Sequence, residues 1–144
     1  NLLIAGIGPE EEKVRSIANS KTNVHYLGYQ SKQNTISLIR GSDLLIQPSL
    51  MEGTSSTLLE AMGCETCIIA SNVGGNTEII ENNKTGVLIE TNNAEKLLDK
   101  ISDLLTEKEK RIMMTAAALK TVVKYDWKQV GKLYLDIYED LLHQ

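Results

Sequence analysis

The sequence predicts an α/β fold: a Rossmann-like open parallel sheet with helices on both faces and extra helices at its C-terminal end. Short apolar runs rich in Ile, Leu and Val alternate with segments of helical periodicity over residues 2–89, which is typical of successive βαβ units. After the last apolar run, the chain continues through three patterns that mark helix starts. We therefore expect a single layered domain spanning residues 1–144.

Five strands follow from the apolar runs, with boundaries at residues 2–7, 24–27, 44–47, 66–70 and 87–89. The first helix is expected to open at Gly8-Pro9-Glu10-Glu11, since Pro suits the first helical position and acidic residues favour the positive end of the helix dipole. It runs to about residue 19. Further helices are predicted over residues 33–40, 58–62 and 78–81.

Three capping-box patterns predict the C-terminal helices. They are Asn92-x-x-Glu95, Thr106-x-x-Glu109 and Asp126-x-x-Gln129, in which side chains satisfy backbone donors reciprocally. Apolar stripes at helical spacing predict the core faces of the last two helices, and the aromatic residues beside them are expected to pack there as well. These residues are Ile112, Ala116, Leu119, Val123, Val130, Leu133, Ile137 and Leu141, with Trp127, Tyr134 and Tyr138.

The composition and charge of the chain argue against some classes of function. The chain has 144 residues, 42% hydrophobic and 24% charged, with a formal net charge of -4; this balance argues against a nucleic-acid surface, which needs clustered Lys and Arg. No apolar run approaches the roughly 18 residues that span a bilayer, and the start of the chain does not resemble a signal peptide. We expect a cytoplasmic protein, cut from a longer chain because it begins directly with a buried strand.

Cys64 and Cys67 form a C-x-x-C pattern, which raises a redox or metal alternative. A zinc site would need a second pair of ligands, and His25 and His143 lie far from the cysteines in sequence. We therefore predict two reduced thiols and no metal.

Three polar loops follow predicted strands, where ligands of open α/β sheets bind. The first loop is Gly6-Ile7-Gly8-Pro9. Glu11 follows it at the position where a dinucleotide-binding fingerprint would have its third glycine, so a Rossmann dehydrogenase is not expected. The alternative to a ligand contact in this loop is a tight turn between strand and helix.

In the second loop, two carboxylates, Glu52 and Glu60, bracket a Gly/Ser/Thr-rich helix start that would suit a diphosphate. For Glu60 the alternative is a capping box with Thr57, and for Glu52 a solvated charge.

The third loop, Gly74-Gly75-Asn76-Thr77-Glu78, again puts glycines before a short helix. Together the loops predict one anionic ligand across the sheet edge.

Residues 49–62, SLMEGTSSTLLEAM, resemble the Glu-x7-Glu motif of GT-B glycosyltransferases of the family 4, or group 1, type. The similarity extends from the first glycine loop through Leu27-Gly28-Tyr29 and residues 68–75 to Glu78-Ile79-Ile80, the segment 85–89 and the C-terminal helices, and so covers nearly the whole chain. The resemblance implies the C-terminal half of a GT-B fold, the domain that binds the nucleotide sugar.

The resemblance also implies roles for individual residues. Glu60 would bind the ribose and Glu52 the transferred sugar, as the catalytic-site carboxylate. The diphosphate would lie along the backbone of Gly53, Thr54, Ser55, Ser56 and Thr57. The remaining donor contacts would come from Gly6, Gly8, Tyr29, Gly74, Gly75 and Asn76.

The resemblance further implies a metal-independent, mostly retaining enzyme without a cofactor. Its donor would be a UDP- or GDP-sugar, and its acceptor a glycan or a lipid-linked molecule held by an N-terminal domain that is absent here. Polysaccharide or glycoconjugate synthesis, in the cytoplasm or peripherally at the inner membrane face, is the expected setting.

This sequence departs from the family pattern after the motif helix. Glu65 and Cys67 replace a common glycine and proline, so Glu65 is expected to be left-handed. The basic residues that grip the diphosphate in the family lie upstream of the first strand, so the isolated segment is not expected to be active. Two rival functions are a sugar-nucleotide epimerase of similar scaffold and a non-catalytic, flavodoxin-like binding module.

Overall fold

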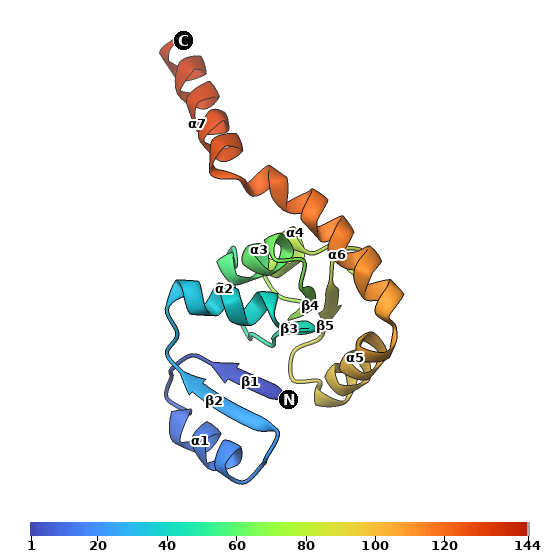
Figure 1. The fold of residues 1–144 in the computed structure, drawn as a ribbon. Helices are drawn as coiled ribbons and strands as arrows, with labels where there is room; N and C mark the ends of the chain where they lie inside the picture. Colours follow the sequence, from blue (N-terminus) through green and yellow to red (C-terminus); the bar gives the residue numbers. More distant parts are fainter. Residues whose placement is uncertain (144) are drawn as a thin grey trace. The chain divides into compact units, whose positions relative to one another are not determined.

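The computed structural model describes residues 1–143. They form two compact units, residues 1–38 and the segment from residue 39 onward, and Figure 1 shows the elements of each. Helix α2 (Lys32–Arg40) contains the boundary between the two.

The first unit is one βαβ motif. Strand β1 (Leu2–Ala5) and strand β2 (Val24–Gly28) pair in parallel, with Leu2 opposite Val24, and helix α1 (Glu11–Asn19) connects them. The predicted first strand therefore ends two residues early, at Ala5, because the backbone leaves the ladder at Gly6, whose φ of 131° is open to glycine alone. Arg15 pairs with Glu11 one helical turn away, at 2.7 Å.

The second unit contains a parallel sheet with the order β3-β4-β5. Its strands are β3 (Leu44–Gln47), β4 (Cys67–Ser71) and β5 (Val87–Ile89), connected by helices α3 (Ser56–Gly63) and α4 (Asn76–Ile79). Helix α3 begins two residues before the predicted 58–62, and α4 lies two residues before the predicted 78–81. Glu65 in the α3–β4 turn has a φ of 57°, which confirms the left-handed conformation.

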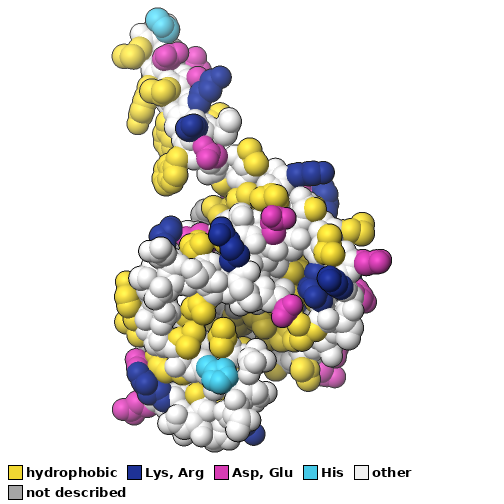
Figure 2. All heavy atoms as spheres, viewed as in Figure 1, with side chains coloured by type: hydrophobic (Ala, Val, Ile, Leu, Met, Phe, Trp, Pro, Cys, Tyr) yellow, Lys and Arg dark blue, Asp and Glu magenta, His cyan; other side chains and the backbone are white. Residues whose placement is uncertain are grey.

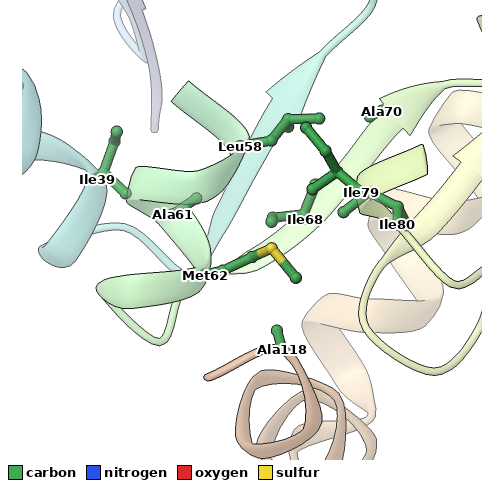
Figure 3. Packing of buried hydrophobic residues seen from close by; sticks show 9 residues of the cluster. All are labelled: Ile39, Leu58, Ala61, Met62, Ile68, Ala70, Ile79, Ile80 and Ala118. Atoms are coloured by element: carbon green, nitrogen blue, oxygen red, sulfur yellow. The ribbon is translucent and has the colours of Figure 1, made fainter. Parts of the chain in front are cut away.

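All five residues of β4 are buried, as expected for the central strand of a parallel sheet covered on both faces. Ile68 and Ala70 pack into one cluster with α3, α4 and Ala118, shown in Figure 3. Cys67 and Ile69 pack into a second cluster, with Val87, Ile89, Leu104 and Met114. Alternate residues of a strand point to opposite faces, so helices cover both faces of this sheet and the predicted α/β class is confirmed, with the strands divided between two sheets.

The C-terminal region contains α5 (Ala94–Thr106), α6 (Lys108–Val122), the 3-10 helix η1 (Val123–Tyr125) and α7 (Trp127–Leu142). The Asp126 cap is confirmed, since its carboxylate accepts from the Lys128 N–H at 2.8 Å. The first cap is Asn93 rather than Asn92, which is left-handed. The prediction that Thr106 caps the next helix is wrong. Thr106 is the last residue of α5, and its hydroxyl donates to the Asp103 carbonyl within that helix.

The buried face of α6 differs from the predicted stripe. Met114 and Ala118 are buried, whereas Ile112 and Val123 are more than half exposed. Ala118 packs in the cluster with α3 and β4, and Met114 packs against Cys67 of β4, so the buried face of α6 is the one whose side chains fit these neighbours.

Helix α7 buries none of its described side chains, and hydrophobic side chains are visible along it in Figure 2. The predicted core positions Leu133, Ile137 and Leu141 are exposed, as is Trp127, at 86%, with Tyr134 and Tyr138. The prediction that they pack in a core is therefore wrong within this structure. No helix in the described part of the chain is long and apolar enough to cross a membrane.

Candidate functional site

The candidate site lies where β3 and β4 end. The two strands are parallel neighbours, with Gln47 opposite Ala70 at their last paired positions. The loop 48–55 leaves β3 and the loop 72–75 leaves β4, so both emerge at the carboxyl edge of the sheet. This is the edge at which open α/β sheets bind ligands.

The Glu52 carboxylate is held through one of its oxygens. Glu52 Oε1 accepts a hydrogen bond from Gln47 Nε2 and another from Ser49 Oγ, each at 2.9 Å. No described residue donates a hydrogen bond to Oε2 of Glu52. The side chain is half-buried. Glu52 is therefore anchored on the protein side with one oxygen left to accept from a ligand, which is not the arrangement of a freely solvated loop charge.

Ser55 is the N-cap of helix α3. Its hydroxyl accepts from the Leu58 N–H at 3.4 Å and lies 2.9 Å from Gln47 Nε2, and the residue is only 6% exposed. The Ser55 hydroxyl is thus engaged inside the protein, so a contact with a ligand would come from its backbone. Because Ser55 is the N-cap, the alternative in which Thr57 caps the helix is wrong.

The N–H groups of Ser56 and Thr57 donate to no acceptor within residues 1–143, as is usual in the first turn of a helix. Glu60 lies half-buried in the second turn of α3. Two carboxylates, Glu52 and Glu60, therefore flank a helix start whose backbone donors and positive dipole end favour anions.

The glycine pair 74–75 packs directly on the Glu52 loop. The Gly75 N–H donates to the Glu52 carbonyl at 3.1 Å. A Cβ on Gly74 would lie 2.2 Å from the Glu52 carbonyl oxygen, and one on Gly75 would lie 2.1 Å from the Gly53 carbonyl oxygen. The structure therefore brings together the Glu52 loop and the glycine loop, as the sequence predicted, and at these two positions only glycine fits.

Asn76 follows the glycine pair and is fully buried. Its Nδ2 donates to the Ser71 carbonyl at 3.0 Å, while its Oδ1 has no partner among the described residues. Asn76 thus braces the start of α4 against the end of β4, and the predicted donor contact of this residue stays a prediction.

The site has little positive charge of its own. The sequence has no Lys or Arg between Arg40 and Lys84, so the two loops and α3 offer a diphosphate only uncharged donors: backbone N–H groups, hydroxyls and the exposed amide of Asn72. In the described part of the chain, no three His, Cys, Asp or Glu side chains form a group that could hold a metal ion.

The remaining predicted contacts, Gly6, Gly8 and Tyr29, belong to the first unit. The Gly6 carbonyl accepts from the Tyr26 hydroxyl at 2.8 Å, and its N–H donates to the Gly28 carbonyl, also at 2.8 Å. The pKa of Tyr26 is raised by burial and by the nearby Glu11 carboxylate. Gly8 has open space where a Cβ would be, and Tyr29 is 74% exposed. The structure does not bring these residues together with the Glu52 loop in one unit.

Cys64 and Cys67 are free thiols. Cys67 is buried with its sulfur 3.8 Å from that of Met114, and burial raises the pKa of the Cys67 thiol. A reactive thiol needs a lowered pKa and access to solvent. Cys67 therefore serves packing at the start of β4.

Gln47 and Ser49 are the site residues that sequence reasoning missed. The available signal was the strand Leu-Leu-Ile-Gln, an apolar run that ends in an amide at the ligand-binding edge of the sheet.

These loops, the parallel sheet and the carboxylates define an α/β domain with a candidate ligand site at the carboxyl edge of its sheet. The chain matches the family described as glycosyl transferases group 1 over residues 1–121, and it therefore belongs to that family.

A relative from Campylobacter jejuni, N,N'-diacetylbacillosaminyl-diphospho-undecaprenol alpha-1,3-N-acetylgalactosaminyltransferase, is 33% identical over 119 residues, which are 83% of this chain and 31% of the relative. An uncharacterized glycosyltransferase of Methanocaldococcus jannaschii is 29% identical over 98% of this chain and 41% of its own length. The chain thus spans about three tenths of the first relative and about two fifths of the second.

Two solved structures share the fold. A glycosyltransferase from Rickettsia africae superposes with a TM-score of 0.86 at 26% identity, over 97% of this chain and 39% of that one. Anabaena HepE in complex with UDP-glucose gives a TM-score of 0.80 at 20% identity, over 99% of this chain and 40% of the other.

Proposed function

We propose that this segment is the donor-binding domain of a glycosyltransferase, which moves a sugar from a nucleoside diphosphate sugar to an acceptor. The observation that carries the proposal is the pair of carboxylates around the start of α3, with Glu52 held on one oxygen and backed by the glycine pair. A carboxylate accepts hydrogen bonds from sugar hydroxyls. In this proposal Glu60 binds the ribose and Glu52 the transferred sugar.

The diphosphate lies between these two carboxylates. The open N–H groups of Ser56 and Thr57 and the dipole of α3 stabilise its charge, together with the backbone of Gly53 and Thr54. Because residues 41–83 contain no Lys or Arg, the rest of the compensating charge comes from outside the two loops. The reaction we propose uses no metal ion and retains the configuration at the anomeric carbon, as the resemblance of residues 49–62 to the family 4 type implies.

The relatives support the choice of substrates. The name of the Campylobacter jejuni relative specifies transfer of N-acetylgalactosamine to a diphospho-undecaprenol-linked sugar, and the Anabaena structure contains UDP-glucose. We propose a UDP- or GDP-sugar as donor and a glycan or lipid-linked acceptor, held by a further N-terminal domain. The reaction takes place in the cytoplasm, at the inner membrane face when the acceptor is lipid-linked.

Calorimetric titration with UDP, GDP, ADP and CDP tests the proposal. We expect one diphosphate to bind, and Glu60→Gln to weaken it by about 1–3 kcal/mol, which is typical of a lost hydrogen bond to a charged group. Glu109→Gln, a matched loss of charge at an exposed position in the first turn of α6, is expected to leave the affinity unchanged.

An affinity for the nucleoside diphosphate that is the same in Glu60→Gln as in the wild type contradicts the assignment of Glu60 to the ribose. If none of the four nucleotides binds, the titration is repeated in the full-length enzyme, and failure there contradicts the donor-site proposal itself.

A further inference from the structure

We propose that Gln47 is a positioning residue, which fixes the carboxylate of Glu52 and aligns it with the start of helix α3. This inference rests on the proposed function, because it concerns how the sugar-binding carboxylate is held.

The first argument is the anchorage of Gln47. It is the last residue of β3, and its backbone is paired with Ala70 of the fully buried strand β4. Glu52, by contrast, lies on a loop without regular structure. A flexible glutamate loses rotamer freedom when it is fixed, and a contact from a strand end fixes it before the ligand arrives.

The second argument is the direction of the Gln47 amide. A carboxylate is only an acceptor, so the group facing Glu52 Oε1 at 2.9 Å is the Nε2 donor. The same amide lies against the Ser55 hydroxyl, with Nε2 at 2.9 Å and Oε1 at 3.2 Å. Gln47 therefore connects the carboxylate directly to the N-cap of α3, whose first turn carries the open N–H groups.

The third argument is that hydrogen bonds from within residues 1–143 reach only one of the two Glu52 carboxylate oxygens. Gln47 and Ser49 both donate to Oε1, and no described residue donates to Oε2. The hydrogen bonds from Gln47 and Ser49 thus set the direction of Oε2 and leave that oxygen open to a ligand. Ser49 donates from the loop itself, so Gln47 is the contact that ties the carboxylate to the sheet.

The test compares the affinity of the chain for a nucleoside diphosphate with that for its sugar form, using UDP with UDP-glucose and GDP with GDP-mannose. Gln47→Met keeps the size of the side chain and removes the donor. We expect the preference for the sugar form to fall about tenfold, the effect of one lost hydrogen bond to a charged group, and the affinity for the bare diphosphate to change less than twofold. Gln129→Met on α7 is the matched control and leaves both affinities unchanged.

The double variant separates positioning from a structural effect. Glu52→Gln is expected to lower the preference by itself, and adding Gln47→Met to Glu52→Gln is expected to lower it little further, since Gln47 acts through Glu52. Additive losses would mean that Gln47 affects the site only through stability, and would overturn the inference.

An unchanged preference in Gln47→Met, with a lowered one in Glu52→Gln, would also overturn the inference and leave the proposed function standing. An unchanged preference in Glu52→Gln would overturn the role of Glu52 in the proposed function, and this inference with it.

Discussion

Replacing Gly75 by alanine tests the contact on which the site is built. The added Cβ would lie 2.1 Å from the Gly53 carbonyl oxygen, 2.5 Å from its carbon and 2.9 Å from the Thr54 nitrogen. All three atoms belong to the backbone, so no side chain can rotate away. Since an ordinary contact begins at 3.4 Å, one of the two loops has to move by about 1 Å.

The expected loss follows from two contributions. Overpacking of this kind costs about 1–3 kcal/mol, and the hydrogen bond from the Gly75 N–H to the Glu52 carbonyl, 3.1 Å long, contributes about 1 kcal/mol. We expect the free energy of unfolding to fall by about 2–4 kcal/mol. If the loop moves instead, the displaced Glu52 is expected to weaken binding of the nucleotide sugar by about tenfold, the effect of one lost hydrogen bond to a charged group.

Urea unfolding and titration with the nucleotide sugar measure the two outcomes separately. The control is Gly131→Ala within α7, where an added Cβ meets nothing within 4 Å, and where alanine is expected to stabilise the helix by up to about 1 kcal/mol. If Gly75→Ala matches the wild type in both stability and affinity, the two loops do not approach as closely as we describe.

Two further predictions concern α3 and the cysteines. Ser55→Ala removes the N-cap of α3 and is expected to lower the free energy of unfolding by about 1–2 kcal/mol in urea titrations; Ser56→Ala, inside the first turn, serves as the control and an equal loss there would contradict the cap assignment. Iodoacetamide labelling followed by mass spectrometry is expected to modify half-buried Cys64 before buried Cys67. Burial raises the pKa of the Cys67 thiol, so its thiolate forms at a higher pH than is usual for cysteine. We therefore expect Cys67 to be labelled more slowly than Cys64 at neutral pH, and labelling of both thiols at the same rate would refute this order.

The sequence predicted the strands to within two residues because each apolar run is bounded by polar or turn-forming residues. Strand β5 lies at the predicted residues, and β4 was displaced by one residue. Helix faces were harder to predict. In α6 several apolar stripes compete, and the choice of Met114 and Ala118 depends on the shape of the neighbouring elements, which a local pattern does not contain.

The candidate site was predictable to the extent that it follows from strand ends and loop composition. Glu52, Glu60 and the glycine pair carry such signals in their spacing. The contact from Gln47 to Glu52 spans five residues and depends on how the loop turns back over the strand end, so only the structure could supply it. Thr106 failed as a cap for a related reason, since a single residue, Glu107, separates α5 from α6 and leaves no room for an extended cap.

The burial of β4 sets an order of local stability across the site. Strand β4 is hydrogen-bonded on both edges and covered on both faces, so its amide hydrogens exchange with solvent only when the whole second unit opens. Strand β3 lies at the edge of its sheet and is half-buried along its length. Local opening is therefore expected to release β3, with Gln47 and the Glu52 loop, before it releases β4, which the glycine pair follows. The more stable side of the site is the one that provides only backbone, and Glu52, which we propose contacts the transferred sugar, lies on the side that opens first.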